Sequence, residues 1–256
     1  MGSVSIEIFD LKESQALVLY RNVWSQSMNA SPFISPRILD ILIGEGKQLD
    51  VAFLYYDTQI IGAFPYSITN GCLSLAGESM SDSIQLLFKP KTPLYQKYEA
   101  IRCLIQNLMP SSIIFRKLSS TNLDSLLLVK SLKELAYHYA YVESWRNPII
   151  RQPNKLFDEA KFLKVFNKTN TRYYSNKFRR DHNYTVDVIR ANEGDNIKRW
   201  MEHFYMYHEF RWSETNTPSI YSSRSSRKLL ESKVKAWIDE GCGLLFSLNV
   251  EGIPVS

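Results

Sequence analysis

The pattern of a β-hairpin occurs twice in this chain, once in its first quarter and once at its end. Residues 52–63 (Ala-Phe-Leu-Tyr-Tyr-Asp-Thr-Gln-Ile-Ile-Gly-Ala) and residues 245–256 (Leu-Phe-Ser-Leu-Asn-Val-Glu-Gly-Ile-Pro-Val-Ser) align without a gap. Each reads as an apolar strand, a polar turn of two to three residues and the beginning of a returning apolar strand. Ser256 falls inside the second returning strand, which leaves an unpaired strand edge. The pattern therefore predicts two related halves, of which the second is incomplete.

The composition is that of an ordinary globular protein with one large or two small domains. The 256 residues are 45% hydrophobic and 22% charged, without a disorder-prone tract. No apolar run approaches the roughly 18 residues of a membrane-spanning helix, and the first residues lack a secretory apolar region. The three cysteines, Cys72, Cys103 and Cys242, are widely spaced and suggest neither disulfides nor zinc. These features predict a cytoplasmic protein without a membrane span.

Positive charge is concentrated in residues 151–180. This segment holds nine Lys or Arg against only Asp158 and Glu159, so its own net charge is +7. The net charge of the whole chain is +5, so the rest of the chain is slightly negative. Such a segment can meet the phosphates of a nucleotide cofactor, a lipid head group or RNA, or it can be the solvated face of a helix. The sequence leaves these readings open.

Periodicity predicts a mixed α/β domain over residues 1–150. The expected order is a strand (4–9), two helices (14–26 and 36–43), three strands (51–56, 60–68 and 72–76), a helix (98–108), a strand (113–118), a helix (123–136) and an extended segment (137–142). Ser35 and Pro36 are typical of a helix start, and Asn70-Gly71 is typical of a two-residue hairpin turn. A strand, helix, strand passage after an antiparallel meander implies a mixed sheet.

This order resembles that of the GNAT acetyltransferase superfamily. Three short segments are similar to those of the double-GNAT family linked to cellulose and other exopolysaccharide synthesis: residues 30–36 (Ala-Ser-Pro-Phe-Ile-Ser-Pro), 62–65 (Gly-Ala-Phe-Pro) and 208–212 (His-Glu-Phe-Arg-Trp). The resemblance covers nearly the whole chain. It implies two tandem GNAT-like domains and transfer of an acetyl or other acyl group from acyl-CoA to an amine or hydroxyl, with a small molecule or a saccharide as acceptor.

The second half is expected to restart the same order after a basic bridge at residues 151–182. Helices are expected at 158–166 and 171–181, and the incomplete C-terminal domain at 183–256 opens with an alternating strand at 184–189. Ile197, Met201, Phe204, His208 and Arg211 then follow one helical face, which is apolar until His208. A second helix at 230–238 closes at Gly241, and a strand at 243–248 opens the final hairpin.

The glycine-rich turn that would bind acyl-CoA is missing from both halves. The resemblance implies that such a turn holds the pyrophosphate on backbone N–H groups at a helix N-terminus. The two Gly-x-Gly pairs, Gly44-Gly46 and Gly241-Gly243, follow helices and so read as helix terminators. In the first half residues 88–95 precede the equivalent helix without a glycine. We therefore expect no cofactor site in the first half, a main acyl-CoA turn beyond Ser256, and weak or absent acyl-CoA binding by these 256 residues.

The best candidates for chemistry border the loop between the two helices of the second half, at about residues 212–223. The resemblance implies that this loop forms a wall of the acceptor pocket. His208 could then accept a proton from the attacking amine or hydroxyl, Arg211 could hold an anionic group, and Trp212 could stack on a sugar. Positively charged side chains are also stabilised at a helix C-terminus by the negative end of the helix dipole. His208 and Arg211 could therefore simply stabilise the end of their helix, and this alternative stays open.

Weaker candidates lie elsewhere in the chain. Asp82 follows an inner strand and could contact substrate, or it could be an ordinary turn residue. The basic bridge supplies possible phosphate ligands, which are Arg172, Lys177, Arg179 and Arg180. His203 and His208 are five residues apart and do not share a helical face, so the sequence predicts no metal site.

Two other functions remain open from the sequence. An aminoacyl transferase of the peptidoglycan-bridge type also pairs two GNAT halves and uses charged tRNA, which the basic bridge could bind; in the other readings no nucleic acid is expected. A non-catalytic binding module, in which a partner completes the unfinished sheet, predicts a dimer through the open strand edge.

Overall fold

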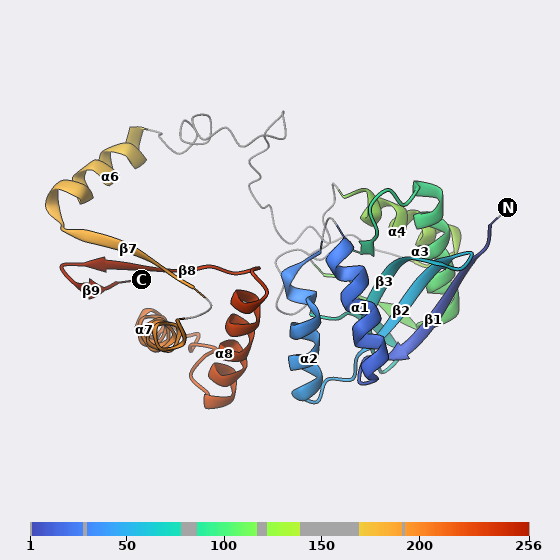
Figure 1. Cartoon of the computed structure of the whole chain (residues 1–256), viewed down its shortest axis with the longest axis horizontal. Helices are drawn as coiled ribbons and strands as arrows, with labels where there is room; N and C mark the ends of the chain where they lie inside the picture. Colours follow the sequence, from blue (N-terminus) through green and yellow to red (C-terminus); the bar gives the residue numbers. More distant parts are fainter. Residues whose placement is uncertain are drawn as a thin grey trace. The chain divides into compact units, whose positions relative to one another are not determined.

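A computed structural model describes residues 2–27, 30–77, 86–116, 122–138, 169–190 and 193–255 of the chain. The chain separates into two compact units, Met1–Ser144 and Trp145–Ser256, shown in Figure 1. The boundary expected at residue 150, the bridge helix expected at 158–166 and Asp82 all lie outside the described residues. Each unit contains a β-sheet with helices packed against it.

The first unit contains a mixed sheet in the order β1-β2-β3-β4-β6, with β5 also pairing with β3. Only the pair β4 and β6 is parallel. The mixed α/β fold predicted from the sequence is therefore confirmed. The elements are β1 (Val4–Asp10), α1 (Ser14–Gln26), a 3₁₀ turn (Pro32–Ile34), α2 (Pro36–Gly44), β2 (Asp50–Tyr56), β3 (Gln59–Thr69), β4 (Cys72–Leu75), β5 (Leu87–Phe88), α3 (Leu94–Leu108), β6 (Ser112–Ile113) and α4 (Leu123–Glu134).

Helices cover both faces of this sheet, with α1 and α2 on one side and α3 and α4 on the other (Figure 1). The α3 side has a continuous apolar core. Ala100, Ile101, Leu104 and Ile105 of α3 are buried in one cluster with strand residues such as Leu54. Their helical spacing gives α3 one apolar stripe, which is why it lies along the sheet.

Three predicted elements differ from the structure. Of the strand expected at 113–118, the structure has only β6, which pairs with β4 at Ser112 and Ile113. Ile114 N still donates to Leu73 O, residues 114–116 have no regular structure, and residues 117 and 118 lie outside the described residues. The extended segment expected at 137–142 begins without regular structure at residues 137 and 138, and its remainder lies outside the described residues. The sequence prediction missed β5, a two-residue strand held by pairing with Gly62 and Ala63 of β3.

The second unit repeats the beginning of the first. Its described elements are α6 (Thr169–Asp181), β7 (Tyr184–Ile189), α7 (Gly194–Ser213), α8 (Arg224–Asp239), β8 (Leu245–Val250) and β9 (Ile253–Pro254). The sheet order is β7-β8-β9, with both pairs antiparallel. From β7 onward this is the strand, helix, helix, strand, strand order of β1 to β3, with the same strand pairing.

The hairpin turn is closed in the same way in both units. In the first, Asp57 N donates to Ser3 O at 2.8 Å and Ser3 N donates to Asp57 Oδ1 at 2.9 Å. In the second, Glu251 N donates to Asn183 O at 2.8 Å and Asn183 N donates to Glu251 Oε1 at 2.9 Å. Both acidic residues have a positive φ, 54° for Asp57 and 52° for Glu251. We call this reciprocal pair of bonds the turn clamp.

The turn clamp corrects the alignment of the two hairpins by one residue. The gapless sequence alignment places Asp57 against Val250. In the structure Asp57 corresponds to Glu251, because each is the first residue of its turn. Asp57 follows Tyr56, and Glu251 follows Val250. The first strand has the same register in both, since Val4 pairs with Tyr56 and Tyr184 with Val250. In addition, β3 has a bulge opposite Leu54 and Tyr55, which shifts the pairing of β2 with β3 by one residue.

The second helix of each unit also begins and ends with the same devices. Ser35 caps α2 by accepting from Ile38 N, and Ser223 caps α8 by accepting from Ser226 N. Gly46 and Gly241 follow these helices with φ of +82° and +69°. The residue after each glycine donates back to the helix, Lys47 N to Leu42 O and Cys242 N to Trp237 O. Both glycine pairs are therefore helix terminators, as the sequence predicts.

Candidate functional site

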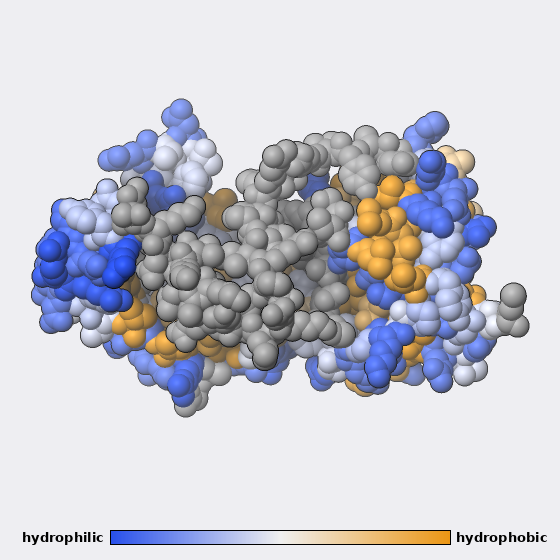
Figure 2. Space-filling view, turned by 90° about the horizontal axis from the view of Figure 1, so that it is seen from above, coloured by the Kyte–Doolittle hydropathy of each residue, from blue (hydrophilic) through white to orange (hydrophobic). Residues whose placement is uncertain are grey.

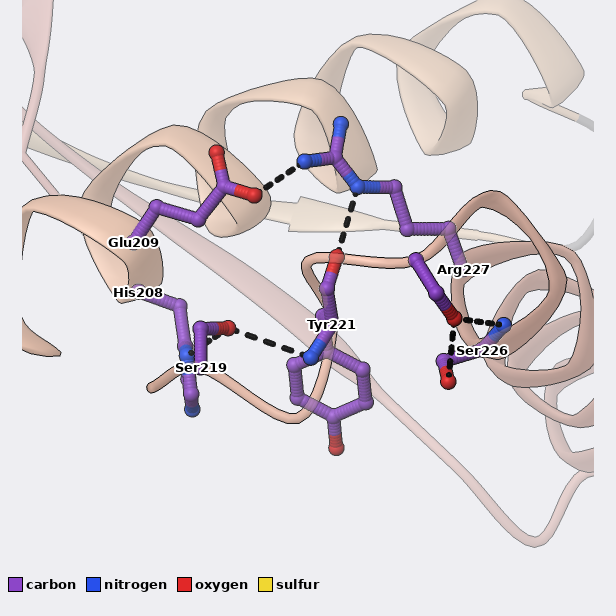
Figure 3. Close-up of polar contacts among 7 residues, drawn as sticks. His208, Glu209, Ser219, Tyr221, Ser226 and Arg227 are labelled. Carbon is purple, nitrogen blue, oxygen red and sulfur yellow. Dashed lines mark hydrogen bonds and ion pairs between the residues drawn. The ribbon is translucent and has the colours of Figure 1, made fainter. Parts of the chain in front are cut away.

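The loop between α7 and α8, residues 214–223, is held against both helices by polar contacts (Figure 3). Arg227 of α8 donates through Nε to Tyr221 O at 2.7 Å and forms an ion pair with Glu209 of α7. Tyr205 of α7 donates through its hydroxyl to Arg227 O at 2.9 Å, and the Arg227 guanidinium lies 4.9 Å from the centre of the Tyr205 ring. These contacts give the loop a defined position beside the end of α7.

His208 is hydrogen-bonded to this loop. Its Nδ1 lies 2.8 Å from Ser219 Oγ, and Tyr221 N donates to the same oxygen at 3.1 Å (Figure 3). A hydroxyl has two acceptor lone pairs, so Ser219 can accept from both groups. In that arrangement Nδ1 carries the proton and Nε2 has a free lone pair, which is the form of imidazole that can act as a base.

Three aromatic rings lie close to the half-buried His208. Their centroids lie 4.9 Å away for Tyr221, 5.6 Å for Phe204 and 6.0 Å for Trp212. Trp212 is one helical turn beyond His208, and the two rings are stacked at 30°. The resulting cluster is an imidazole beside flat apolar surfaces, the combination with which proteins bind a sugar ring or another flat, partly apolar group.

Burial raises the pKa of the Tyr221 phenol above its ordinary value. The pKa of Tyr205 is also raised, first by burial and then by the negative charge of Glu231. Both hydroxyl groups therefore keep their protons at neutral pH and can serve as hydrogen-bond donors. Tyr205 uses its proton to bind Arg227 O.

The structure brings together some of the predicted site residues. His208 and Trp212 belong to one ring cluster, whereas Arg211 lies exposed on the same last turn of α7. The sequence prediction missed Ser219, Tyr221, Glu209 and Arg227. Their relevance depends on contacts between residues 11 to 18 positions apart, which helical periodicity does not reveal.

The basic residues of the bridge lie on α6. Arg172, Lys177, Arg179 and Arg180 are all exposed. Arg179 and Arg180 line one open hollow of about 500 Å³ together with Tyr173 and Asn176, whereas Arg172 and Lys177 are outside its lining. All of the lining residues come from this single helix. Arg179 and Arg180 also occupy the last turn of α6, where the helix dipole favours positive charge.

A second hollow, of about 520 Å³, lies beside the start of α3 in the first unit. Lys89, Lys91 and Thr92 line it together with residues of the β2–β3 turn. This is the place of residues 88–95, where no glycine precedes the helix. Pro93 at the N-cap has no N–H, and the nearby Lys97 ammonium is bound to Asp124 at 3.0 Å. The hollow is positively charged but does not have a glycine-rich phosphate turn.

Neither a metal cluster nor a membrane helix is found in the described part of the chain. No three His, Cys, Asp or Glu side chains are gathered there in a way that could hold a metal ion. Within the same residues, no helix combines the length and apolar character needed to cross a membrane. In comparisons with known proteins, the chain matches no protein-family model and no curated protein.

Proposed function

We propose that the chain belongs to an acyltransferase of the double-GNAT type, which moves an acetyl or other acyl group from acyl-CoA to an amine or hydroxyl acceptor. A saccharide is the acceptor class that best suits the rings around His208. The observation that carries the proposal is the repeated strand, helix, helix, strand, strand unit with His208 at the helix–loop junction of its second copy.

The proposed role of His208 follows from its hydrogen bond to Ser219. With Nδ1 donating to Ser219, Nε2 can take the proton that an amine or hydroxyl loses as it adds to a thioester carbonyl. The thiol is the leaving group and is released with a proton. Trp212 and Tyr221 would hold the acceptor ring beside Nε2. Transfer of this kind forms no covalent intermediate on the protein, so it needs no nucleophilic side chain.

The described residues do not fit the nucleotide part of acyl-CoA. Gly241 and Gly243 terminate α8 instead of opening a helix, so they cannot present N–H groups to a pyrophosphate. We therefore expect no saturable heat when acetyl-CoA at micromolar concentrations is titrated into the chain in a calorimeter. Tight saturable binding would contradict this expectation.

A donor without the nucleotide tests the catalytic proposal separately. With the small thioester S-acetyl-N-acetylcysteamine and glucosamine, we expect acetyl transfer that depends on His208. His208→Gln should lower the rate by about 100-fold or more, the usual contribution of a general base. His203→Gln is the matched control, because His203 is on the same helix but outside the ring cluster. Equal rates for wild type and His208→Gln would refute the proposal.

The exposed basic face of α6 favours a second candidate, an aminoacyl transferase with charged tRNA as donor. Arg180 lies near Tyr173, so a cation and a ring are available for phosphate and base contacts. This candidate predicts tRNA binding that weakens steeply with salt, because phosphate contacts release counterions. It also predicts weaker binding for the double variant Arg179→Gln/Arg180→Gln. Binding that is absent or insensitive to salt would exclude it.

A further inference from the structure

Arg227 joins the loop between α7 and α8 to α7. Its Nε donates to Tyr221 O at 2.7 Å, and its Nη2 forms an ion pair with Glu209 of α7 (Figure 3). These contacts use two different nitrogens of one rigid guanidinium, so they form together. The carbonyl of Arg227 also accepts from the Tyr205 hydroxyl at 2.9 Å. One residue in the first turns of α8 thus binds the loop backbone and two side chains of α7.

The loop backbone that Arg227 binds is the turn that holds His208. Tyr221 N donates to Ser219 Oγ at 3.1 Å, and that oxygen lies 2.8 Å from His208 Nδ1. Tyr221 is therefore fixed through its N–H toward Ser219 and through its carbonyl toward Arg227. Loss of the carbonyl contact frees the turn that places Ser219 beside the imidazole.

The first unit contains the same loop turn. Phe33 N donates to Ser31 Oγ at 3.3 Å, as Tyr221 N donates to Ser219 Oγ. Each of these two serines lies four residues before the serine that caps the following helix. Trp24 of α1 binds this turn through an indole, with Nε1 donating to Ser31 O at 3.2 Å. The turn is thus common to both units, and the copy in the second unit binds a titratable ring.

The helix position of Arg227 is filled by a leucine in the first unit. Leu39 is equivalent to Arg227, because each lies four positions after its N-cap serine, Ser35 in α2 and Ser223 in α8. Leu39 is completely buried, so an apolar side chain at this position is compatible with the turn. Exposure alone does not call for an arginine, because hydrophobic residues reach the surface of the chain in patches (Figure 2), and Ile220 of the same loop is 68% exposed.

We propose that Arg227 is a positioning residue that holds the loop turn at His208 and so keeps the imidazole in the tautomer with its proton on Nδ1. The tautomer of an imidazole is set by the hydrogen bond that one of its nitrogens makes. Without a partner at Nδ1, the ring favours the other tautomer, with the proton on Nε2 and no free lone pair there. The inference rests on the proposed function for its consequence in acyl transfer, whereas the tautomer is measured without substrate.

The test is long-range proton–nitrogen NMR correlation of the histidine side chains in the full chain, at about pH 8.5, where an ordinary imidazole is neutral. Comparison with His208→Gln assigns the His208 signals. In the wild type we expect Nδ1 to carry the proton. Arg227→Leu, which introduces the residue of the first unit, should shift His208 toward the tautomer protonated at Nε2. Lys228→Gln is the matched control, because it removes an exposed positive charge at the next position of α8 and should leave the tautomer unchanged.

A second variant tests the ion pair with Arg227 in place. Glu209→Ala removes the carboxylate, and the tautomer of His208 should shift in the same direction. Circular dichroism shows whether each variant is folded, and if Arg227→Leu is not, Glu209→Ala decides the question. A wild type protonated at Nε2 overturns the proposal. Folded variants with the wild-type tautomer overturn it as well, because Arg227 then only stabilises the fold.

The transfer assay separates this proposal from the proposed function. With the small thioester and glucosamine, Arg227→Leu should lower kcat by about 10-fold or more and leave KM for the thioester unchanged, because a misplaced base slows the chemical step. Absence of transfer by the wild type refutes the proposed function and leaves the tautomer result standing. Wild-type transfer together with an unchanged tautomer in folded Arg227→Leu refutes the positioning role alone.

Discussion

At the scale of single residues, the candidate site depends on where α7 turns polar. His208 lies on the face that Met201 and Tyr205 bury toward the core, yet it is close enough to the helix end to meet the following loop. Ser219 is 8% exposed and is the side chain that joins His208 to the loop backbone. The position of the imidazole is thus set by a serine that has no other feature to distinguish it in the sequence.

Replacing Ser219 tests this arrangement. Ser219→Ala removes the partner of His208 Nδ1 and the acceptor of Tyr221 N–H. We expect a loss of about 1 kcal/mol in the free energy of unfolding, measured by urea titration, because a buried hydrogen bond is lost. The transfer rate with the small thioester should fall as well. Ser222→Ala, an exposed serine of the same loop, should change neither quantity.

Buried tyrosines make stability depend on alkaline pH. Burial raises the pKa of Tyr20, and burial together with the charge of Asp50 raises that of Tyr66. The folded chain holds these protons, whereas the unfolded chain releases them above about pH 10. The free energy of unfolding should therefore decrease as pH rises above about 10.

The measurement is urea unfolding between about pH 9 and 11.5, with phenolate absorbance at 295 nm followed in parallel. Tyr66→Phe should reduce the slope of stability against pH in this range. A slope that is the same in Tyr66→Phe and wild type would show that Tyr66 does not contribute.

At the scale of elements, the two units use the same local devices. The serine N-cap, the glycine after the second helix and the turn clamp appear in both, with different side chains around them. Each device satisfies backbone groups at a helix end or a strand end, where no regular partner exists. Their recurrence in the same order argues for one unit used twice more strongly than the short hairpin alignment does.

The turn clamp can be tested at Glu251. Glu251→Ala removes the acceptor of Asn183 N, and we expect a loss of about 0.5–1.5 kcal/mol in the free energy of unfolding. Glu251→Gln is the matched control, because it keeps a side-chain oxygen of the same reach and the same backbone preference. Equal losses for both variants would mean that the oxygen is not needed. Asp57→Ala and Asp57→Asn make the same comparison in the first unit.

At the scale of the whole molecule, the two units differ in how much apolar surface they bury. The first has helices on both faces of its sheet, and its cluster on the α3 side alone includes Leu54, Phe64, Leu104 and many others. Among the described residues of the second unit, the cluster has four buried members, on one face of the sheet. Each fully buried aliphatic side chain contributes about 1.5–3 kcal/mol, so the second unit should be the less stable.

Matched core variants test this difference by calorimetry. We expect two thermal transitions, with the second unit unfolding first. Ile238→Ala should lower the first transition and Ile101→Ala the second, each costing about 2–5 kcal/mol in its own unit. A single transition that both variants shift alike would show that the chain unfolds as one cooperative body.

The sequence alone determined most local structure, because helix caps, turns and periodicity depend on neighbours within a few residues. The strand β7 has the bounds that alternation predicts, the Asn70-Gly71 hairpin joins β3 to β4, and both glycine pairs terminate helices. The apolar face of α7 and its change of polarity at His208 were also readable from helical spacing.

Only the tertiary structure decided the features that join distant parts of the chain. Pairing gives β5 its place on β3 and ends β6 after two residues. Folding of the loop between α7 and α8 brings Ser219 to His208, and the turn clamp shifts the hairpin alignment by one residue. These features come from contacts between distant residues, for which local sequence patterns carry little information.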